Sequence, residues 1–118
     1  MAIRIFGKNL NDKQVLPYGL ASAVYGIGIN RAMKVCEKAN LSLTMRVKEL
    51  KDSDAMLIQN AIKDLGYVVA SDLQREERNH DRRLASIRCY RWLCRERGIP
   101  SRGQRTRSNG NTANKRKA

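Results

Sequence analysis

The sequence predicts an all-α fold, in which a small helical domain is followed by a long basic helix and an extended C-terminal tail. Three observations lead to this prediction. Apolar residues recur at helical spacing in several segments of residues 1–70. Glycine and proline residues stand where helical segments end. After Pro100 no apolar residue larger than alanine occurs, so the tail cannot offset its ordering entropy by burial. We expect the helical domain over residues 1–70, the basic helix over 71–98 and the tail over 99–118.

The first third of the chain is expected to hold a short extended segment and two helices. Residues 2–6 alternate enough for the extended segment, and residues 7–12 have the composition of a turn. A helix is predicted over 15–24, where Pro17 is tolerated because it falls in the first turn. A second helix is predicted over about 30–38, with its apolar residues on one side.

A connector and a third helix are expected in the middle of the chain. Asn40 is a natural stop for the second helix. Residues 41–50 alternate like a strand, but no partner strand is evident, so an extended connector is predicted. Asp52 or Ser53 can cap a third helix that ends at Gly66. The predicted apolar stripe of this helix is Met56, Leu57, Ala61, Ile62 and Leu65.

The fourth helix is expected to be long and basic. Ser71, three residues before Gln74, resembles a capping box that opens it. Gly98 is placed to end the helix, and Pro100 prevents it from restarting. Its apolar positions are sparse, and they are Leu73, His80, Leu84 and Ile87.

The formal net charge is +13, and its distribution points to a polyanionic partner. Residues 1–74 carry 10 Lys and Arg against 7 Asp and Glu, whereas residues 75–118 carry 14 against 4. The positive field therefore lies mainly in the last third of the chain. An anionic membrane would attract this segment as well, but the segment lacks the apolar face of an interfacial helix. Nucleic acid is the better partner, and no membrane association is predicted.

Other function classes find little support in the sequence. No apolar run approaches the roughly 18–20 residues of a membrane span, and none resembles the core of a signal peptide. The three cysteines (Cys36, Cys89 and Cys94) are an odd number, which favours a reducing compartment. Their spacing, with the single His80, falls short of a zinc pattern, and no catalytic motif occurs. We expect no enzyme activity, metal, cofactor or small-molecule substrate.

Tyr25-Gly26-Ile27-Gly28, between two predicted helices, is the first candidate for RNA contact. Glycine lets the main chain approach a phosphate closely, and the next helix presents free N–H groups to it. Arg31, near the start of that helix, would add side-chain charge. The alternative is a helix–helix turn that needs flexible residues. The residues alone leave both interpretations open.

Arginines on the predicted fourth helix are the second candidate. Arg75, Arg78 and Arg82 are three and four residues apart and therefore share one face, and Arg83 follows them. Acidic residues are interleaved with them, so the alternative is a solvated face with ion pairs inside the helix.

Arg91 with its two aromatic neighbours is the third candidate. Tyr90 and Trp92 can stack on unpaired bases or ribose rings. The alternative is ordinary packing of an aromatic helix end against the domain.

The C-terminal segment also resembles a known family. The run CYR at 89–91, followed by GIPSRGQRTRSN at 98–109, is similar to the characteristic motif of the thirteenth small-subunit ribosomal protein family. Further matches occur in family order over nearly the whole chain. They are AIRI at 2–5, YGIG at 25–28, RVKEL at 46–50, and DL at 72–73 followed by RE at 75–76.

The resemblance implies a structural RNA-binding protein of the small subunit with a helix–two-turns–helix domain whose turns face RNA. Members of this family lie on the ribosomal RNA of the small-subunit head, beside the nineteenth small-subunit protein. They contribute bridges to the large subunit through ribosomal RNA and the fifth large-subunit protein, and their tail extends toward tRNA. The residues and the resemblance together indicate RNA contact at Tyr25, Gly26, Gly28, Arg31, Arg75, Arg82, Arg83, Arg88, Arg91, Arg95, Arg97, Arg102, Gln104, Arg105, Arg107 and Asn109.

Within the tail we expect a division of labour. Arg102, Arg105 and Arg107 would hold ribosomal RNA. A terminal cluster, consisting of Lys115, Arg116 and Lys117, lies beyond an uncharged spacer. That spacer, residues 108–114, spans about 20 Å when extended, so the terminal cluster is expected to face tRNA.

The sequence departs from the family pattern at several positions. The family usually has glycine at Trp92 and basic residues at Cys94 and Glu96, and the chain also differs at Gly110 and Asn111. Such relaxed, cysteine-richer versions resemble mitochondrial relatives, so a ribosome of the mitochondrial matrix is favoured over one of the bacterial cytoplasm or the plastid. The alternative functions are a DNA-binding helix–hairpin–helix module of a repair enzyme and a free nucleoid protein or RNA chaperone.

Overall fold

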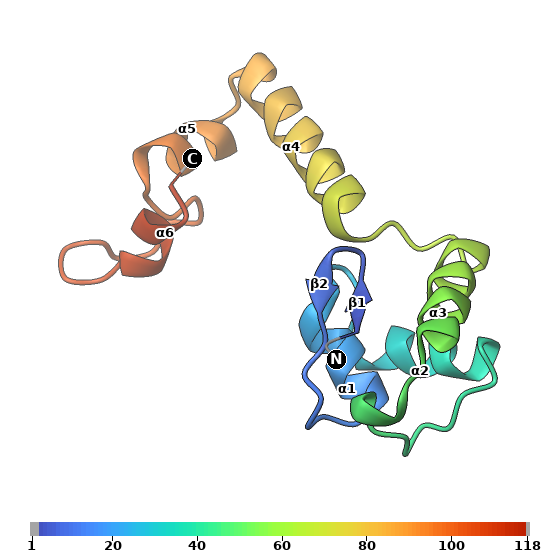
Figure 1. Ribbon diagram of the computed structural model, residues 1–118. Helices are drawn as coiled ribbons and strands as arrows, with labels where there is room; N and C mark the ends of the chain where they lie inside the picture. Colours follow the sequence, from blue (N-terminus) through green and yellow to red (C-terminus); the bar gives the residue numbers. More distant parts are fainter. Residues whose placement is uncertain (1–2, 118) are drawn as a thin grey trace. The chain divides into compact units, whose positions relative to one another are not determined.

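The computed structural model describes residues 3–117, and within them the secondary structure is predominantly helical (Figure 1). The chain divides after Gln74 into two compact units, here called the N-terminal unit and the C-terminal unit. The predicted all-α class is confirmed. The elements of the described residues, in order, are β1 (Arg4–Ile5), β2 (Lys8–Asn9), α1 (Leu16–Ala23), α2 (Ile29–Lys38), the 3₁₀ helix η1 (Val47–Glu49), α3 (Asp52–Asp64), α4 (Ala70–Ile87), α5 (Tyr90–Arg97) and α6 (Asn111–Lys115).

A small antiparallel hairpin opens the N-terminal unit. Arg4 pairs with Asn9 and Ile5 with Lys8. The extended segment predicted over 2–6 is confirmed at residues 4 and 5, whereas Phe6 belongs to the turn and residue 2 lies outside the described residues. The turn predicted over 7–12 was wrong in extent, because residues 8 and 9 return as a strand. Phe6 and Gly7 reverse the chain in two residues, both at positive φ (49° and 77°), as tight hairpin turns require.

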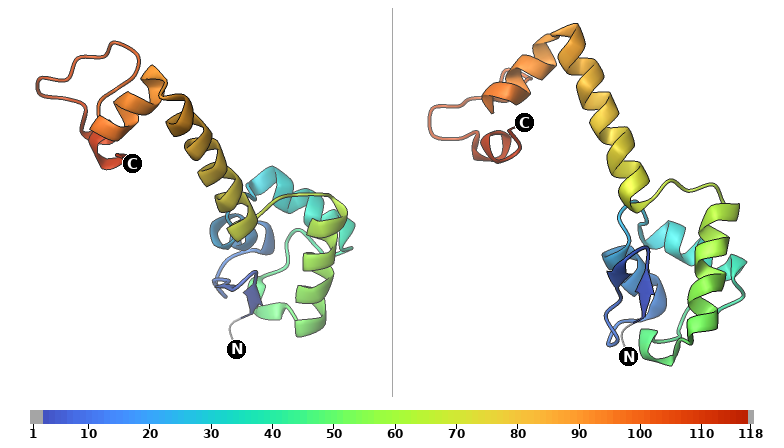
Figure 2. Two further views of the ribbon diagram at one scale, coloured as in Figure 1. Left: turned by 90° about the horizontal axis from the view of Figure 1, so that it is seen from above. Right: turned by 45° about the horizontal axis from the view of Figure 1, so that its top comes forward.

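The core of the N-terminal unit lies between α1, α2 and α3 (Figure 2). Its largest fully buried side chains include Leu16 and Leu20 of α1, Val35 of α2, and Ile58 and Ile62 of α3. Burial of such aliphatic side chains contributes about 1.5–3 kcal/mol each. The predicted positions of α1 and α2 are confirmed to within one residue at each end.

Residues 41–50 are tied to the start of α1, contrary to the prediction of a connector without a partner. Val15 and Arg46 form an antiparallel bridge. The N–H of Leu16 donates to the carbonyl of Met45 at 2.8 Å, and the N–H of Val47 donates to the carbonyl of Gln14 at 3.0 Å. The partner was not evident because it is a single bridge rather than a strand. η1 follows directly and buries Val47 completely.

α3 differs from its prediction in its cap and in its buried face. It begins with Lys51 at the capping position, not Asp52 or Ser53, and the Lys51 N–H donates to Asp54 Oδ2 at 3.1 Å. The prediction that Met56 and Leu57 belong to the apolar stripe was wrong, since they are 69% and 49% exposed. A helix turns about 100° per residue, and Met56 and Leu57 therefore lie outside the buried face, which consists of Ala55, Ile58, Ala61 and Ile62. Ala61 and Ile62 of the predicted stripe are thus confirmed as buried. Gly66 (φ 70°) follows the helix as predicted.

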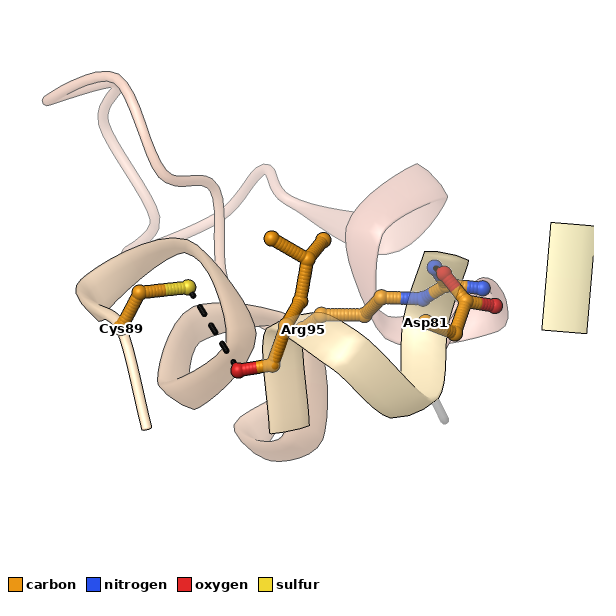
Figure 3. Close-up of polar contacts among 4 residues, drawn as sticks. Asp81, Cys89 and Arg95 are labelled. Carbon is orange, nitrogen blue, oxygen red and sulfur yellow. Dashed lines mark hydrogen bonds and ion pairs between the residues drawn. The ribbon is translucent and has the colours of Figure 1, made fainter. Parts of the chain in front are cut away.

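The single basic helix predicted to end at Gly98 is two helices. α4 begins at Ala70, so Ser71 lies inside its first turn rather than at the predicted cap. Arg88 has the left-handed conformation (φ 55°) and ends α4, because a residue in that conformation cannot continue a right-handed helix. The Cys89 thiol donates to the Leu84 carbonyl at 3.8 Å (Figure 3). α5 then ends at Gly98 (φ 72°) as predicted.

Gly26 packs tightly inside the N-terminal unit. Its φ is 97°, and an added Cβ would lie 2.6 Å from Leu73 Cδ2 and 3.2 Å from the Val68 carbonyl oxygen. The neighbouring Tyr25 carbonyl accepts from the Ala70 N–H at 2.8 Å. The turn between α1 and α2 is thus fixed against the segment that leads into α4.

Replacement of Gly26 by alanine should destabilise the N-terminal unit by about 2–3 kcal/mol, because the new methyl group adds backbone strain and overlap with Leu73. Gly28→Ala is the matched control, since Gly28 has φ −93° and nothing within 4 Å of an added Cβ. It should cost less than about 1 kcal/mol. Urea unfolding followed by circular dichroism measures both values, and equal losses in the two variants would contradict the prediction.

Cys36 should make stability depend on pH in the alkaline range. Burial, with a smaller contribution from Glu37, raises the pKa of this thiol from 9.0 to about 11. Below pH 9 the thiol keeps its proton in both states. Between pH 9 and 11 the unfolded chain ionises while the folded chain does not, so the contribution of Cys36 to stability is lost as pH rises.

The melting temperatures of the wild type and Cys36→Ala, measured from pH 7 to 11, test this linkage. The advantage of the wild type should shrink above pH 9. Lysine and tyrosine ionisation is common to both proteins and cancels in the difference. A constant difference over the whole range would show that Cys36 is not the responsible group.

Candidate nucleic-acid interface

The C-terminal unit combines high positive charge with very little buried surface. No residue of α4 is buried. Among the described residues of this unit, Cys94 on α5 is the only buried apolar side chain. The shape of the C-terminal unit therefore depends mainly on backbone conformation and on a few specific contacts.

An arginine loop, consisting of residues 99–110, connects α5 to α6 (Figure 1). It contains Arg102, Arg105 and Arg107, and all three are exposed. A Cβ on Gly110 would lie 3.6 Å from Thr106 Cγ2 and 3.9 Å from Pro100 Cδ. The end of the loop therefore lies close to its beginning.

The sequence predicts an extended tail, but in the structure the tail folds back. Gly103 and Gly110, at φ 69° and 98°, let the chain reverse direction. α6 then returns to the end of α5, where an added Cβ on Gly98 would lie 3.1 Å from Asn114 Oδ1 and 3.2 Å from Asn114 Cα. The prediction assumed that only apolar side chains could fold the tail, whereas glycine turns and the close approach of Asn114 to Gly98 accompany its return.

α5, the arginine loop and α6, together with Leu84 of α4, line an open cavity of about 970 Å³, here called the arginine cavity. Its lining residues include five arginines and no aspartate or glutamate. Several residues predicted to bind RNA are thereby brought together, and these are Arg91, Arg95, Arg102, Gln104, Arg105 and Asn109. Arg116 of the terminal cluster also lines the cavity.

Arg95 differs from the other cavity arginines because it is already paired. Its guanidinium donates to the Asp81 carboxylate and joins α5 to α4 (Figure 3). The side chains are 45% and 30% exposed, so this pair contributes no more than about 1 kcal/mol to stability. Its main effect is to reduce the charge that Arg95 offers to a ligand.

The remaining predicted arginines of this unit lie outside the cavity. Arg75, Arg82 and Arg83 are exposed on α4. Arg88 is exposed at the left-handed break between α4 and α5. Arg97 and Arg107 are exposed as well.

The glycine turn of the N-terminal unit has internal contacts of its own. Arg31 donates to the Gly26 carbonyl at 3.1 Å and lies over the Tyr67 ring at 4.8 Å from its centroid. Both contacts hold this arginine on the turn. Gly28 precedes α2 and is open, and Tyr25 is 48% exposed. The structure thus gives Gly26 and Arg31 roles in packing and leaves the outer face of the turn accessible.

The aromatic residues of α5 are placed differently from one another. Tyr90 is 67% exposed, whereas Trp92 is half-buried. A side-chain hydrogen bond with Cys94 raises the pKa of the Tyr90 hydroxyl. Neither ring lines the arginine cavity.

Sequence reasoning missed three residues that shape this interface. Asp81 pairs with Arg95, Cys89 bonds to α4, and Asn114 contacts Gly98. Asp81 and Arg95 are 14 residues apart and meet only because the chain breaks at Arg88. No spacing rule for a continuous helix could have indicated this pair.

Other kinds of site are not evident in the part of the chain that the structure describes. Residues 3–117 contain no group of three or more His, Cys, Asp or Glu side chains that could hold a metal ion. Within the same range no helix has the length and apolar character needed to cross a membrane.

A helical domain followed by a compact, arginine-rich unit is the organisation of a protein that binds polyanions. The chain matches the family model of ribosomal protein S13/S18 over residues 4–112 and belongs to that family. It is thus a structural protein of the small ribosomal subunit, binds ribosomal RNA there, and serves translation. Proteins of this kind are generally not enzymes. The family resemblance drawn from the sequence is confirmed.

Removal of the Asp81 carboxylate should strengthen RNA binding by releasing Arg95. Asp81→Asn is compared with Glu96→Gln, which removes the same charge from an exposed position of α5. Both variants should gain slightly from the change in net charge. Asp81→Asn should gain about two- to threefold more, and its salt dependence should steepen by about 0.7 per added phosphate contact.

Fluorescence anisotropy with a labelled 20-nucleotide oligouridylate, at several KCl concentrations, measures affinity and salt slope. Circular dichroism spectra of both variants verify that the helices persist. Identical gains in the two variants would mean that Arg95 is equally available with and without Asp81.

Proposed function

We propose that this protein anchors ribosomal RNA in the head of the small subunit through its C-terminal unit. The observation that carries the proposal is the convergence of exposed arginines at one cavity whose lining holds no carboxylate. A guanidinium offers five donors in a planar fork that matches phosphate geometry. Mutual repulsion of the gathered charges disfavours the empty site, and a bound anion relieves that repulsion.

The anchoring would depend on the shape of the RNA rather than on its sequence. Arginine contacts to phosphates position a nucleic acid without reading its bases. The shared cavity favours a segment whose backbone is folded tightly enough to bring several phosphates together. The exposed arginines of α4 would add contacts along a neighbouring strand.

The more detailed partners follow from the family resemblance. We propose that the nineteenth small-subunit protein is a neighbour, and that bridges to the large subunit run through ribosomal RNA and the fifth large-subunit protein. Met56 and Leu57, exposed on α3, supply an apolar surface suited to a protein contact. Lys115 and Lys117 of the terminal cluster, which do not line the arginine cavity, are proposed to face tRNA.

We also propose the mitochondrial matrix as the compartment. The support lies in the departures from the family pattern at Trp92, Cys94 and Glu96 and in three cysteines without a disulfide among them. Mass spectrometry of salt-washed ribosomal subunits from isolated organelles tests this assignment.

Changing Arg102, Arg105 and Arg107 to alanine should lower occupancy of the small subunit several-fold, and the loss should be larger at raised salt. The matched control replaces Lys8, Lys13 and Lys63, three exposed lysines of the N-terminal unit, by alanine. It removes the same charge but should leave occupancy nearly unchanged. The reason is that phosphate contacts are local, whereas net charge acts only weakly at physiological ionic strength.

Quantitative mass spectrometry of subunits washed at about 50 and 200 mM salt gives the occupancy of each variant. If the arginine variant remains as fully bound as the lysine variant, the anchoring role belongs elsewhere on the chain.

A further inference from the structure

We infer that α6 places Arg116 in the same phosphate-binding site as Arg91, Arg102 and Arg105, so that all four act on one sharply bent stretch of single-stranded RNA backbone. The inference rests on the proposed RNA-anchoring function and refines its ligand. It departs from the division of labour expected from the sequence, in which Arg116 faces a separate RNA.

The position of α6 brings Arg116 to the arginine cavity. Arg102 and Arg116 are well separated in sequence, yet both line the arginine cavity. The contact of Asn114 with Gly98 holds α6 at the end of α5, and the Asn114 N–H donates to the Gly110 carbonyl at 3.1 Å. Lys115 and Lys117, on either side of Arg116, are not part of the cavity lining. The terminal cluster is therefore split, because of its three members only Arg116 lines the cavity.

The arginines of the cavity differ in how much positive charge they offer to a ligand. Of the five cavity arginines, Arg95 is paired with Asp81. The other four are exposed, and no acidic residue lines the cavity beside them. Like charges that line one cavity repel one another, and a bound anion relieves this repulsion. The ligand must therefore carry several negative charges at short spacing.

The other lining residues of the cavity offer no aromatic ring for base stacking. Leu84, Ile99 and Pro100 are the large apolar members of the lining, and it contains no aromatic side chain. Sites that hold unpaired bases usually stack them on aromatic rings. A cavity without such rings suits phosphates and ribose rather than bases.

The volume of the arginine cavity limits the size of the ligand. The cavity volume of about 970 Å³ is at the upper end of the range for drug-sized ligands, about 300–1,000 Å³. A few nucleotides match this volume, whereas a base-paired helix does not. The structure therefore favours a single-stranded turn with two or three phosphates inside the cavity.

The test uses a ligand too short to reach two separate sites. The full-length protein is titrated with 5′-phosphorylated triuridylate, which has three phosphates, and with a 20-nucleotide oligouridylate. Binding is followed by NMR of the arginine side-chain N–H groups. Arg102→Ala and Arg116→Ala should each weaken triuridylate binding about five- to tenfold. Lys117→Ala is the matched control and should change it less than twofold.

Asn114→Pro separates the position of Arg116 from its charge. Proline removes the N–H that bonds to the Gly110 carbonyl and should displace α6 without altering net charge. It should weaken triuridylate binding about as much as Arg116→Ala does. Its effect on the 20-nucleotide probe should be smaller, since a long strand can still reach the displaced arginine.

The inference is overturned if Arg116→Ala leaves triuridylate affinity within twofold of the wild type while Arg102→Ala weakens it. Equal losses in Arg116→Ala and Lys117→Ala would also overturn it, because net charge alone would then explain the effect. The same holds if the wild type fails to bind triuridylate at low salt. Failure of the proposed function is distinguishable, since binding of the 20-nucleotide probe would then be insensitive to Arg102 and Arg105 as well.

Discussion

Repulsion among like charges is the constraint on which the architecture of the C-terminal unit depends. This unit has 14 basic and 4 acidic residues, and its described part buries a single apolar side chain. Hydrophobic burial therefore cannot hold it together. Backbone conformation does much of this instead, with left-handed residues at Arg88 and Gly98 setting the directions of α5 and the arginine loop. The pair between Asp81 and Arg95 adds a contact without consuming the charge of the other arginines.

The two units of the chain thus differ in what they require: the N-terminal unit buries apolar side chains, and the C-terminal unit keeps charged side chains exposed. In the N-terminal unit, three helices and a small hairpin bury an aliphatic core, and Gly26 and Arg31 fix the turn between α1 and α2. In the C-terminal unit, charged groups stay at the surface and converge where the chain reverses. A stable body and a charged binding surface make opposite demands on composition, and the uneven distribution of charge along the sequence reflects this.

Sequence patterns predicted the helices and helix ends that depend on neighbouring residues. They missed the contacts that form only where the chain reverses direction. Helical periodicity located α1 and α2, and Gly66 and Gly98 ended their helices because glycine accepts positive φ. The exposure of Met56 was missed because two apolar faces were possible for α3. The break at Arg88 was missed because arginine normally favours a helix. Composition and family resemblance indicated the arginines as candidates for RNA contact. That Arg116 and Arg102 line one cavity depends on tertiary structure and could not be predicted from spacing.

The sparse burial of the C-terminal unit has a consequence for turnover. Segments with few buried contacts open locally at little free-energy cost and are cleaved from the open state. While RNA occupies the arginines, such opening is suppressed, because binding stabilises the closed form. A copy without RNA leaves the unit that follows Gln74 accessible to proteases. We therefore expect the lifetime of each copy to depend on its incorporation, with surplus protein cleaved first in this unit.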